Sequence, residues 1–228
     1  MLWLVILAEV ANSVVKRYVQ LGVLVLAAGA IYPLVYLRQN FEVTILEAYN
    51  ISKGDLGQFY ATLGVIFVVT YIPSGWLADR ISPRKLIAFS LALTALLGVW
   101  FASVPPVDDL QKIFAGWGIA TGLTFWAALI KAVAVLAKHD EQGRFFGILD
   151  GGRGLVEALL ATLAVGLFAW SLETVETSQA LSRVIWFYIV YLVIIAVVSI
   201  LALSDEMPAG SEQQVDPGQD NIISNLQI

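Results

Sequence analysis

The chain has 228 residues, of which 59% are hydrophobic and only 14% are charged. Soluble domains usually carry about 25% charged residues, so this composition argues against a soluble domain, a disordered chain or a coiled coil. There are 13 Lys and Arg against 18 Asp and Glu, and no basic patch, which argues against a nucleic-acid partner. With no cysteine and a single histidine, we expect no disulfide, no metal, no cofactor and no enzymatic activity.

The net charge of −5 lies at the C-terminal end of the chain. The segment after Ser204 contains no Lys or Arg, and its acidic residues are Asp205, Glu206, Glu212, Asp216 and Asp220. Residues 1–204 are therefore neutral, and residues 205–228 are predicted to form an acidic, disordered tail.

Six apolar stretches are long enough to cross a bilayer, which takes about 20 mostly apolar residues. They are Val19–Leu37, Gln58–Ala78, Leu86–Val104, Ile113–Ala137, Phe145–Trp170 and Val184–Leu203. The sequence therefore predicts an all-α membrane protein with six transmembrane helices in residues 19–204. Residues 1–18 are predicted to form a cytoplasmic or interfacial segment before the bundle. For the short apolar run at residues 1–15, the alternative is that the given sequence starts upstream of the real translation start.

The basic residues beside the spans favour cytoplasmic termini. Loops on the cytoplasmic side keep the excess of Lys and Arg. If the N-terminus is inside, the inner side holds Lys16, Arg17, Arg80, Arg84, Lys85, Lys138 and Arg144. The outer side then holds Arg38, Lys53, Lys112 and Arg183, which is the smaller set. We expect a multi-pass protein of a bacterial inner membrane, with the lipid bilayer as its surroundings.

Ionisable side chains inside a span are costly, so they are usually functional or paired. The third and sixth spans have none in their interior and are expected to face lipid, whereas the first, fourth and fifth are expected to face a cavity. In the fifth span, Asp150, Arg153 and Glu157 share one helix face. Lys131 of the fourth span lies at a similar depth to Asp150, so we predict Lys131–Asp150 and Arg153–Glu157 pairs. The alternative to a cavity-facing charge network is that these pairs have a structural role and only hold the fourth and fifth helices together.

Between the second and third spans stands Gly75-Trp-Leu-Ala-Asp-Arg-Ile-Ser-Pro-Arg-Lys85. It resembles the cytoplasmic loop motif of the major facilitator superfamily, with matches at Gly75, Asp79, Arg80 and Arg84. The run from Glu141 to Arg144 resembles the equivalent loop between the fourth and fifth helices. In that superfamily these loops form a charge network that locks the outward-open state, so the resemblance implies a gating role for these residues and an Asp79–Arg144 pair.

A second resemblance lies in the first span and after it. Tyr36-Leu-Arg-Gln-Asn-Phe41 and Ile51-Ser-Lys-Gly-Asp-Leu-Gly57 are similar to the organophosphate:phosphate antiporter family. That family exchanges glycerol 3-phosphate or hexose phosphates for inorganic phosphate, and the arginine that matches Arg38 is one of its phosphate ligands. The resemblance implies an anion site at Arg38, with Tyr32 and Tyr36 as hydroxyl donors and Lys131, Asp150, Arg153 and Glu157 lining the same cavity.

The chain also departs from that family. Tyr71 stands where its second helix has a lysine, and the Trp-Asn and His features of its fifth helix are absent. The substrate is therefore a small organic anion, with a phosphate ester, a sugar acid and a sulfonated sugar all open.

Six spans make one half of a major facilitator fold, which the resemblance describes as two three-helix inverted repeats. Substrates bind between two such halves. We therefore expect the N-terminal half of a secondary transporter, partnered by a C-terminal six-helix half or by a second copy. A membrane sensor that binds the same solute without transport, and a truncated non-functional product, are the alternatives.

Overall fold

The computed structural model describes residues 2–205, with side chains from residue 14 onward. The predicted tail lies outside this part, except for Asp205. The main helices are α1 (Leu2–Val35), α2 (Arg38–Tyr49), α3 (Lys53–Arg80), α4 (Pro83–Ala102), α5 (Val107–Ile119), α6 (Trp126–Leu136), α7 (Gln142–Leu172) and α8 (Thr177–Ala202). A π-helical segment, η1 (Ala120–Phe125), joins α5 to α6, and a short 3₁₀ turn, η2 (His139–Glu141), precedes α7.

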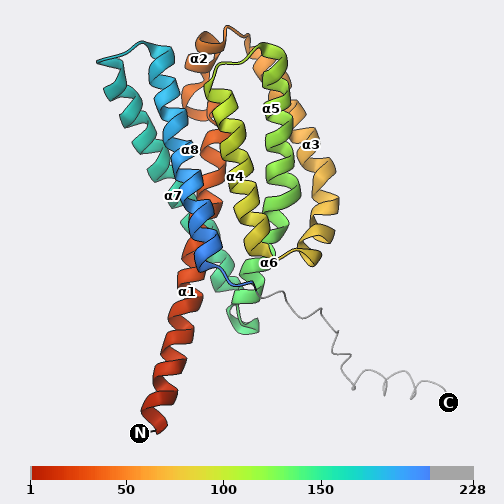
Figure 1. Ribbon diagram of the computed structural model, residues 1–228, viewed down its shortest axis with the longest axis vertical. Helices are drawn as coiled ribbons and strands as arrows, with labels where there is room; N and C mark the ends of the chain where they lie inside the picture. The colour runs from red at the N-terminus through yellow and green to blue at the C-terminus, as the bar shows by residue number, and fades with distance from the viewer. Residues whose placement is uncertain (1, 206–228) are drawn as a thin grey trace, which may run out of the picture.

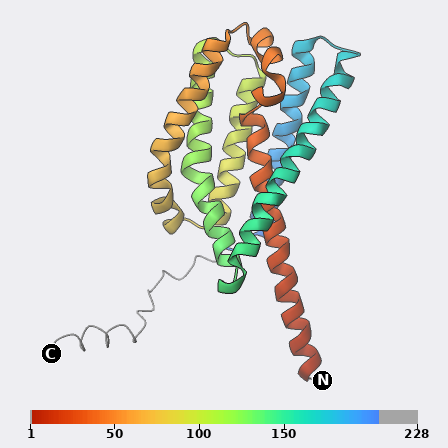
Figure 2. The same cartoon turned by 180° about the vertical axis from the view of Figure 1, so that it is seen from behind.

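Six helical segments are long and apolar enough to cross a membrane, as predicted. They are Val14–Tyr49, Lys53–Arg80, Pro83–Ala102, Val107–Leu136, His139–Leu172 and Thr177–Ala202. Figures 1 and 2 show these segments side by side in one bundle, with α2 at one end and the start of α1 projecting beyond the other. The helix of α1 runs without a break from residue 2 into the first span, so no boundary appears at residue 18.

Helix pairs from distant parts of the sequence form the bundle. The main packing partners are α4 with α8, α1 with α7, α1 with α8, and α3 with α5. The inner side of α1 is almost solvent-free, with Leu24, Ile31 and Leu34 fully buried. Burial of these apolar side chains against neighbouring helices fixes α1 at the centre of the bundle.

The start of α3 shows how one piece of the sequence motif acts structurally. The Ser52 hydroxyl accepts a hydrogen bond from the Asp55 amide at 3.1 Å, and the Asp55 carboxylate accepts one from the Ser52 amide at 2.9 Å. This reciprocal capping box satisfies amide donors that the first helical turn leaves free. The Ser-x-x-Asp spacing therefore defines where the second span begins.

The faces left uncovered by the bundle differ from the expectation. The expected lipid-facing helices, α4 and α8, expose large apolar side chains such as Phe89, Leu96 and Ile194, yet about half of each span is buried inside the bundle. In α3 and α7 only 17% of the most apolar window is buried. Their exposed apolar residues include Val68, Ile72, Leu155 and Leu159. The least covered sides of the described chain are thus the second and fifth spans.

Candidate functional site

Arg38 lies at one end of a row of aromatic side chains. Its guanidinium carbon is 4.1 Å from the centre of the Tyr60 ring, a cation–π distance. Tyr60 stacks with Tyr36 at 5.8 Å between ring centroids, and Tyr36 lies 5.6 Å from Tyr32. Tyr32 in turn lies 5.9 Å from Trp126 of α6. The structure therefore brings Arg38, Tyr32 and Tyr36 together, and adds Tyr60 and Trp126, which the sequence did not indicate.

A break in the first span places Arg38 in this row. Helix α1 ends at Val35, and α2 begins at Arg38. Pro33 near the end of α1 lacks an amide hydrogen, which weakens a helix at this point. The Tyr60 hydroxyl donates a hydrogen bond to the Val35 carbonyl oxygen at 2.9 Å, and so satisfies a carbonyl close to the break. The same contact holds the Tyr60 ring beneath the Arg38 guanidinium.

Arg153 forms the predicted pair with Glu157. Its Nη1 donates to Glu157 Oε1 at 2.9 Å, and its Nε lies 3.9 Å from Asp150 Oδ1. The Arg153 guanidinium also lies 5.8 Å from the Tyr32 ring, so this pair borders the aromatic row. The Nε atom is buried and forms no hydrogen bond within the described residues. The Asp150 side chain is largely exposed.

The predicted Lys131–Asp150 pair is wrong. Lys131 Nζ donates to Asp79 Oδ1 at 2.7 Å and to the Ala78 carbonyl oxygen at 3.0 Å. A similar depth in the bundle does not by itself bring Lys131 and Asp150 together, because Lys131 of α6 faces α3 and not α7. The Lys131 side chain is 20% exposed, whereas Asp79 is 71% exposed. The pair therefore joins the fourth span to the loop motif between α3 and α4.

The predicted Asp79–Arg144 pair is also absent from the described structure. Arg144 lies over the Tyr18 ring at 5.6 Å from its centroid, while Asp79 is paired with Lys131. Glu141 accepts a hydrogen bond from Arg17 Nη2 at 2.5 Å, a contact that the sequence analysis missed. The second loop is thus joined to α1, and within residues 14–205 no ion pair connects it to the first loop.

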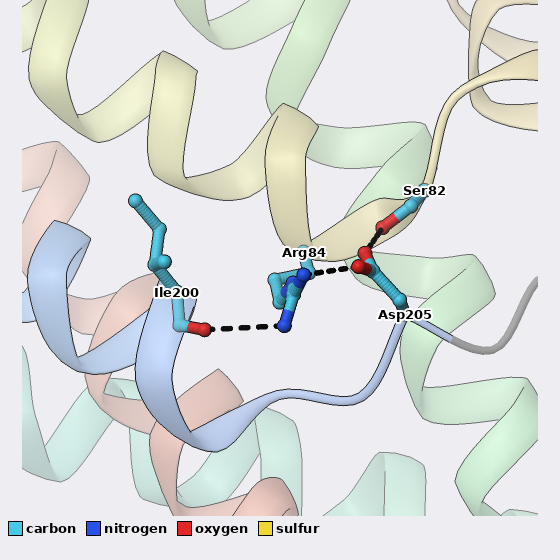
Figure 3. A network of polar contacts seen from close by, with 4 residues as sticks. All are labelled: Ser82, Arg84, Ile200 and Asp205. Carbon is cyan, nitrogen blue, oxygen red and sulfur yellow. Dashed lines mark hydrogen bonds and ion pairs between the residues drawn. The ribbon is translucent and has the colours of Figure 1, made fainter.

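Arg80 and Arg84 point in different directions. Arg80 stacks on the Trp76 ring at 4.0 Å, one turn earlier in α3. Arg84 pairs with Asp205, and it donates to the Ile200 carbonyl oxygen at 3.4 Å (Figure 3). Arg84 of the loop motif therefore contacts the end of α8 and the chain that follows it, in addition to the contacts of the motif with α3 and α6.

Asp205 completes this network from the far end of the described chain. Its Oδ1 accepts a hydrogen bond from the Ser82 hydroxyl at 2.6 Å (Figure 3). That hydrogen bond, together with the positive charges of Arg84 and Lys85, lowers the pKa of the Asp205 carboxyl. Asp205 lies beside the first turn of α4, where a negative charge is favoured by the exposed amide groups.

Helices approach closely at Gly118 and Gly122, and not at Gly75 of the loop motif. Nothing lies within 4 Å of the position a Gly75 Cβ would take. At Gly118 a Cβ would lie 2.8 Å from the Leu63 carbonyl oxygen, and at Gly122 one would lie 2.9 Å from the Phe67 carbonyl oxygen. The two glycines have the Gly-xxx-Gly spacing of closely packed membrane helices, a signal that the sequence analysis overlooked.

The π-helical turn η1 was not foreseen either. It spans Ala120–Phe125 and ends directly before Trp126 of the aromatic row. The Thr121 and Thr124 hydroxyls donate to the Trp117 and Ala120 carbonyl oxygens at 2.7 and 2.8 Å, so polar groups in this turn are satisfied internally. Such turns are frequent at functional sites because they rotate the side chains that follow.

Among residues 2–205, no group of three or more His, Cys, Asp or Glu side chains is placed to hold a metal ion. The polar side chains described above are arginine, lysine, carboxylate and phenol groups. These groups favour recognition of an anion by hydrogen bonds and charge.

Comparison with known proteins agrees with this architecture. The family profile of the Major Facilitator Superfamily matches residues 18–223. Inner membrane protein YqcE of Escherichia coli K12 is 29% identical over 216 residues, covering 93% of this chain and 50% of that protein. Inner membrane protein YihN of the same organism is 28% identical over 196 residues, which are 86% of this chain and 46% of that protein.

A relative with a named solute is more distant. The glycerol-3-phosphate transporter of Bacillus subtilis 168 is 27% identical over 168 residues, which cover 69% of this chain and 37% of that protein. The chain spans about half the length of the first two of these relatives.

Proposed function

Because the chain belongs to the major facilitator superfamily, we propose that it is the N-terminal half of a secondary transporter for a small organic anion. A phosphate ester or a sugar-phosphate-like solute, exchanged for inorganic phosphate, is the specific proposal. The named solute of the Bacillus subtilis relative supports this chemistry. Both termini are proposed to be cytoplasmic, in an inner membrane.

The observation that carries the proposal is the state of Arg38. It is exposed at the start of α2, and it makes no ion pair with any described residue. Lys131 and Arg153, by contrast, are each neutralised by a carboxylate. An exposed guanidinium keeps its charge and offers paired donors that fit the oxygens of a phosphate or a carboxylate. Arg38 is therefore the anchoring group of the proposed site.

The aromatic row gives the rest of the solute a surface. Tyr32 and Tyr36 carry hydroxyl groups that can donate hydrogen bonds to the oxygens of a solute. Arg153 and Glu157 lie at the far end of the row from Arg38. We propose that this end receives the polar body of the solute, while Arg38 receives its charge.

Transport needs a partner surface as well as a site, because substrates of this superfamily bind between two halves. The exposed apolar sides of α3 and α7 support such a partner. Gly75, Asp79 and Lys131 border one hollow on α3 and α6, and Asp79 is exposed there. We propose that a C-terminal six-helix half covers these sides, with a second copy of this chain as the alternative, and that the loop residues control the movement between halves.

Binding of glycerol 3-phosphate to the purified chain in detergent tests the site. Arg38→Gln is expected to weaken binding about ten- to hundredfold, as loss of a hydrogen bond to a charged group typically costs about 1.5–3 kcal/mol. Arg38→Lys is expected to recover only part of this, because lysine lacks the paired donors. Arg183→Gln is the matched control, since in the described structure the Arg183 side chain hydrogen-bonds only to Ser171 and Thr174.

Unchanged affinity in Arg38→Gln would refute the anchoring role. Uptake into vesicles with a co-expressed C-terminal half then tests transport itself. Binding that depends on Arg38 without uptake by any such pair would favour a solute sensor over a transporter.

A further inference from the structure

A second hollow lies at the opposite end of the bundle from Arg38. It has a volume of about 410 Å³ and is formed by α1, α6 and the residues that follow α6 and α8. We call it the basic hollow, and the residues that matter for its chemistry are Lys16, Arg17, Gln20, Val135, Lys138 and Ser204. Its volume falls within the range of about 300–1,000 Å³ that is common for small-ligand sites.

The lining of the basic hollow carries three cations and no acid. Lys16 and Lys138 are exposed, and neither forms an ion pair with a described residue. Arg17 is fixed, because its Nε donates to the Leu136 carbonyl oxygen at 2.9 Å and its Nη2 donates to Glu141. Lys16 and Lys138 are then the two lining cations that form no ion pair within residues 14–205, and they attract an anion that carries at least one negative charge.

The amide of Gln20 also lines the hollow. Gln20 is only 4% exposed. The Ser204 hydroxyl donates to Gln20 Oε1 at 3.5 Å, and within residues 14–205 the amide nitrogen of Gln20 makes no hydrogen bond. The Gln20 amide nitrogen is therefore available to donate a hydrogen bond to an acceptor in the hollow.

One side of the basic hollow is apolar. Val135 lines it and is 40% exposed. A smaller, mostly apolar hollow shares Gln20 and Ser204 with it and continues to Leu24 and Leu203. Charge beside exposed apolar surface, at the end of membrane-spanning helices, is the pattern that receives lipid headgroups and the start of their acyl chains.

We propose that the basic hollow binds the phosphate group of an anionic membrane lipid. Lys16 and Lys138 bind the phosphate by charge, the Gln20 amide donates a hydrogen bond to one of its oxygens, and the acyl chains lie along Val135. Anionic lipids are enriched in the cytoplasmic leaflet, where basic pockets between helices attract their headgroups. This end of the bundle also carries the excess of Lys and Arg that marks the cytoplasmic side. A free phosphate ester shares the headgroup's chemistry but lacks its acyl chains.

Native mass spectrometry of the full chain, with phosphatidylglycerol and phosphatidylcholine of equal chain length, tests the proposal. The chain is expected to retain phosphatidylglycerol preferentially. In the double variant Lys16→Gln/Lys138→Gln, affinity for phosphatidylglycerol is expected to fall about 25-fold, or about 1 kcal/mol for each lysine. Lys53→Gln/Lys112→Gln is the matched control: it removes two lysines that are paired with Glu42 and Asp109, and it should leave lipid affinity unchanged.

Three outcomes would overturn the proposal. One is equal retention of the two lipids, and another is an equal loss of affinity in both double variants. The third separates the two sources of phosphate: inorganic phosphate that displaces the lipid, with a dependence on Lys16 and Lys138, would assign the hollow to a soluble anion. Anion binding at Arg38 is measured independently by the Arg38 variants, so either proposal can fail without the other.

Discussion

Lys131 of the fourth span donates a 2.7 Å hydrogen bond to Asp79 of the loop motif. Its second hydrogen bond, to the Ala78 carbonyl oxygen, lies on the same turn of α3. One lysine therefore secures the last turn of α3 to α6. A cationic side chain within an apolar span is costly when it is alone, and this pairing lowers that cost.

A double-mutant cycle measures this coupling. Lys131→Met and Asp79→Asn are each expected to destabilise the purified protein, and their effects should be non-additive, because each removes one partner of the same ion pair. Unfolding in a detergent mixture gives the free energies. Lys131→Met with Asp150→Asn is the control cycle and should be additive, because no contact joins Lys131 to Asp150. Greater coupling to Asp150 than to Asp79 would contradict the structure.

Gly122→Ala is expected to destabilise the bundle by about 1–3 kcal/mol, the usual cost of forcing extra volume into a packed interface. The new methyl group would lie 2.5 Å from Thr70 Oγ1 and 2.9 Å from the Phe67 carbonyl oxygen, so α3 would have to move. Gly75→Ala is the matched control, as open space surrounds that position. A shift in unfolding midpoint for Gly122→Ala alone is the expected result; equal effects of the two would show that helix propensity dominates.

Glu157→Gln is expected to strengthen anion binding severalfold if the proposed site is correct. The Glu157 carboxylate now neutralises Arg153 at 2.9 Å, and the neutral amide would leave the guanidinium charge available to the solute. Titration with glycerol 3-phosphate in low salt provides the measurement. Asp150→Gln serves as the control, because that carboxylate is exposed and 3.9 Å from Arg153. Weaker binding in Glu157→Gln would instead place Glu157 among the direct hydrogen-bond acceptors of the solute.

The contact of Asp205 with Ser82 and Arg84 is expected to weaken in acid. The folded state lowers the pKa of this carboxyl below its ordinary value of 3.8, so the contact stabilises the protein above that pH. The stabilisation is lost as the pH falls through the lowered value, because the carboxyl is then protonated. Hydrogen exchange at the start of α4 should therefore accelerate below about pH 3.8 relative to Asp205→Asn. Identical pH profiles for the two proteins would argue against the network.

The six spans, the all-helical class and the Arg153–Glu157 pair could be predicted from the sequence alone. Apolar length is a property of each segment by itself, because a bilayer of about 30 Å sets it. Arg153 and Glu157 are four residues apart on one helix, so helix geometry brings them together whatever surrounds them. The start of α3 at Ser52 is local in the same way, since the capping box needs only its own four residues.

Contacts between helices were decided by the tertiary structure. Depth in the bundle follows from residue counts, but the direction a side chain faces depends on how each helix is rotated and which neighbours it packs against. Lys131 therefore meets Asp79 and not Asp150, and Arg84 meets Asp205, which lies 121 residues away in the chain. Gly118 and Gly122 receive the backbone of α3 for the same reason. The basic hollow exists only because the ends of α1, α6 and α8 come together, which no single segment specifies.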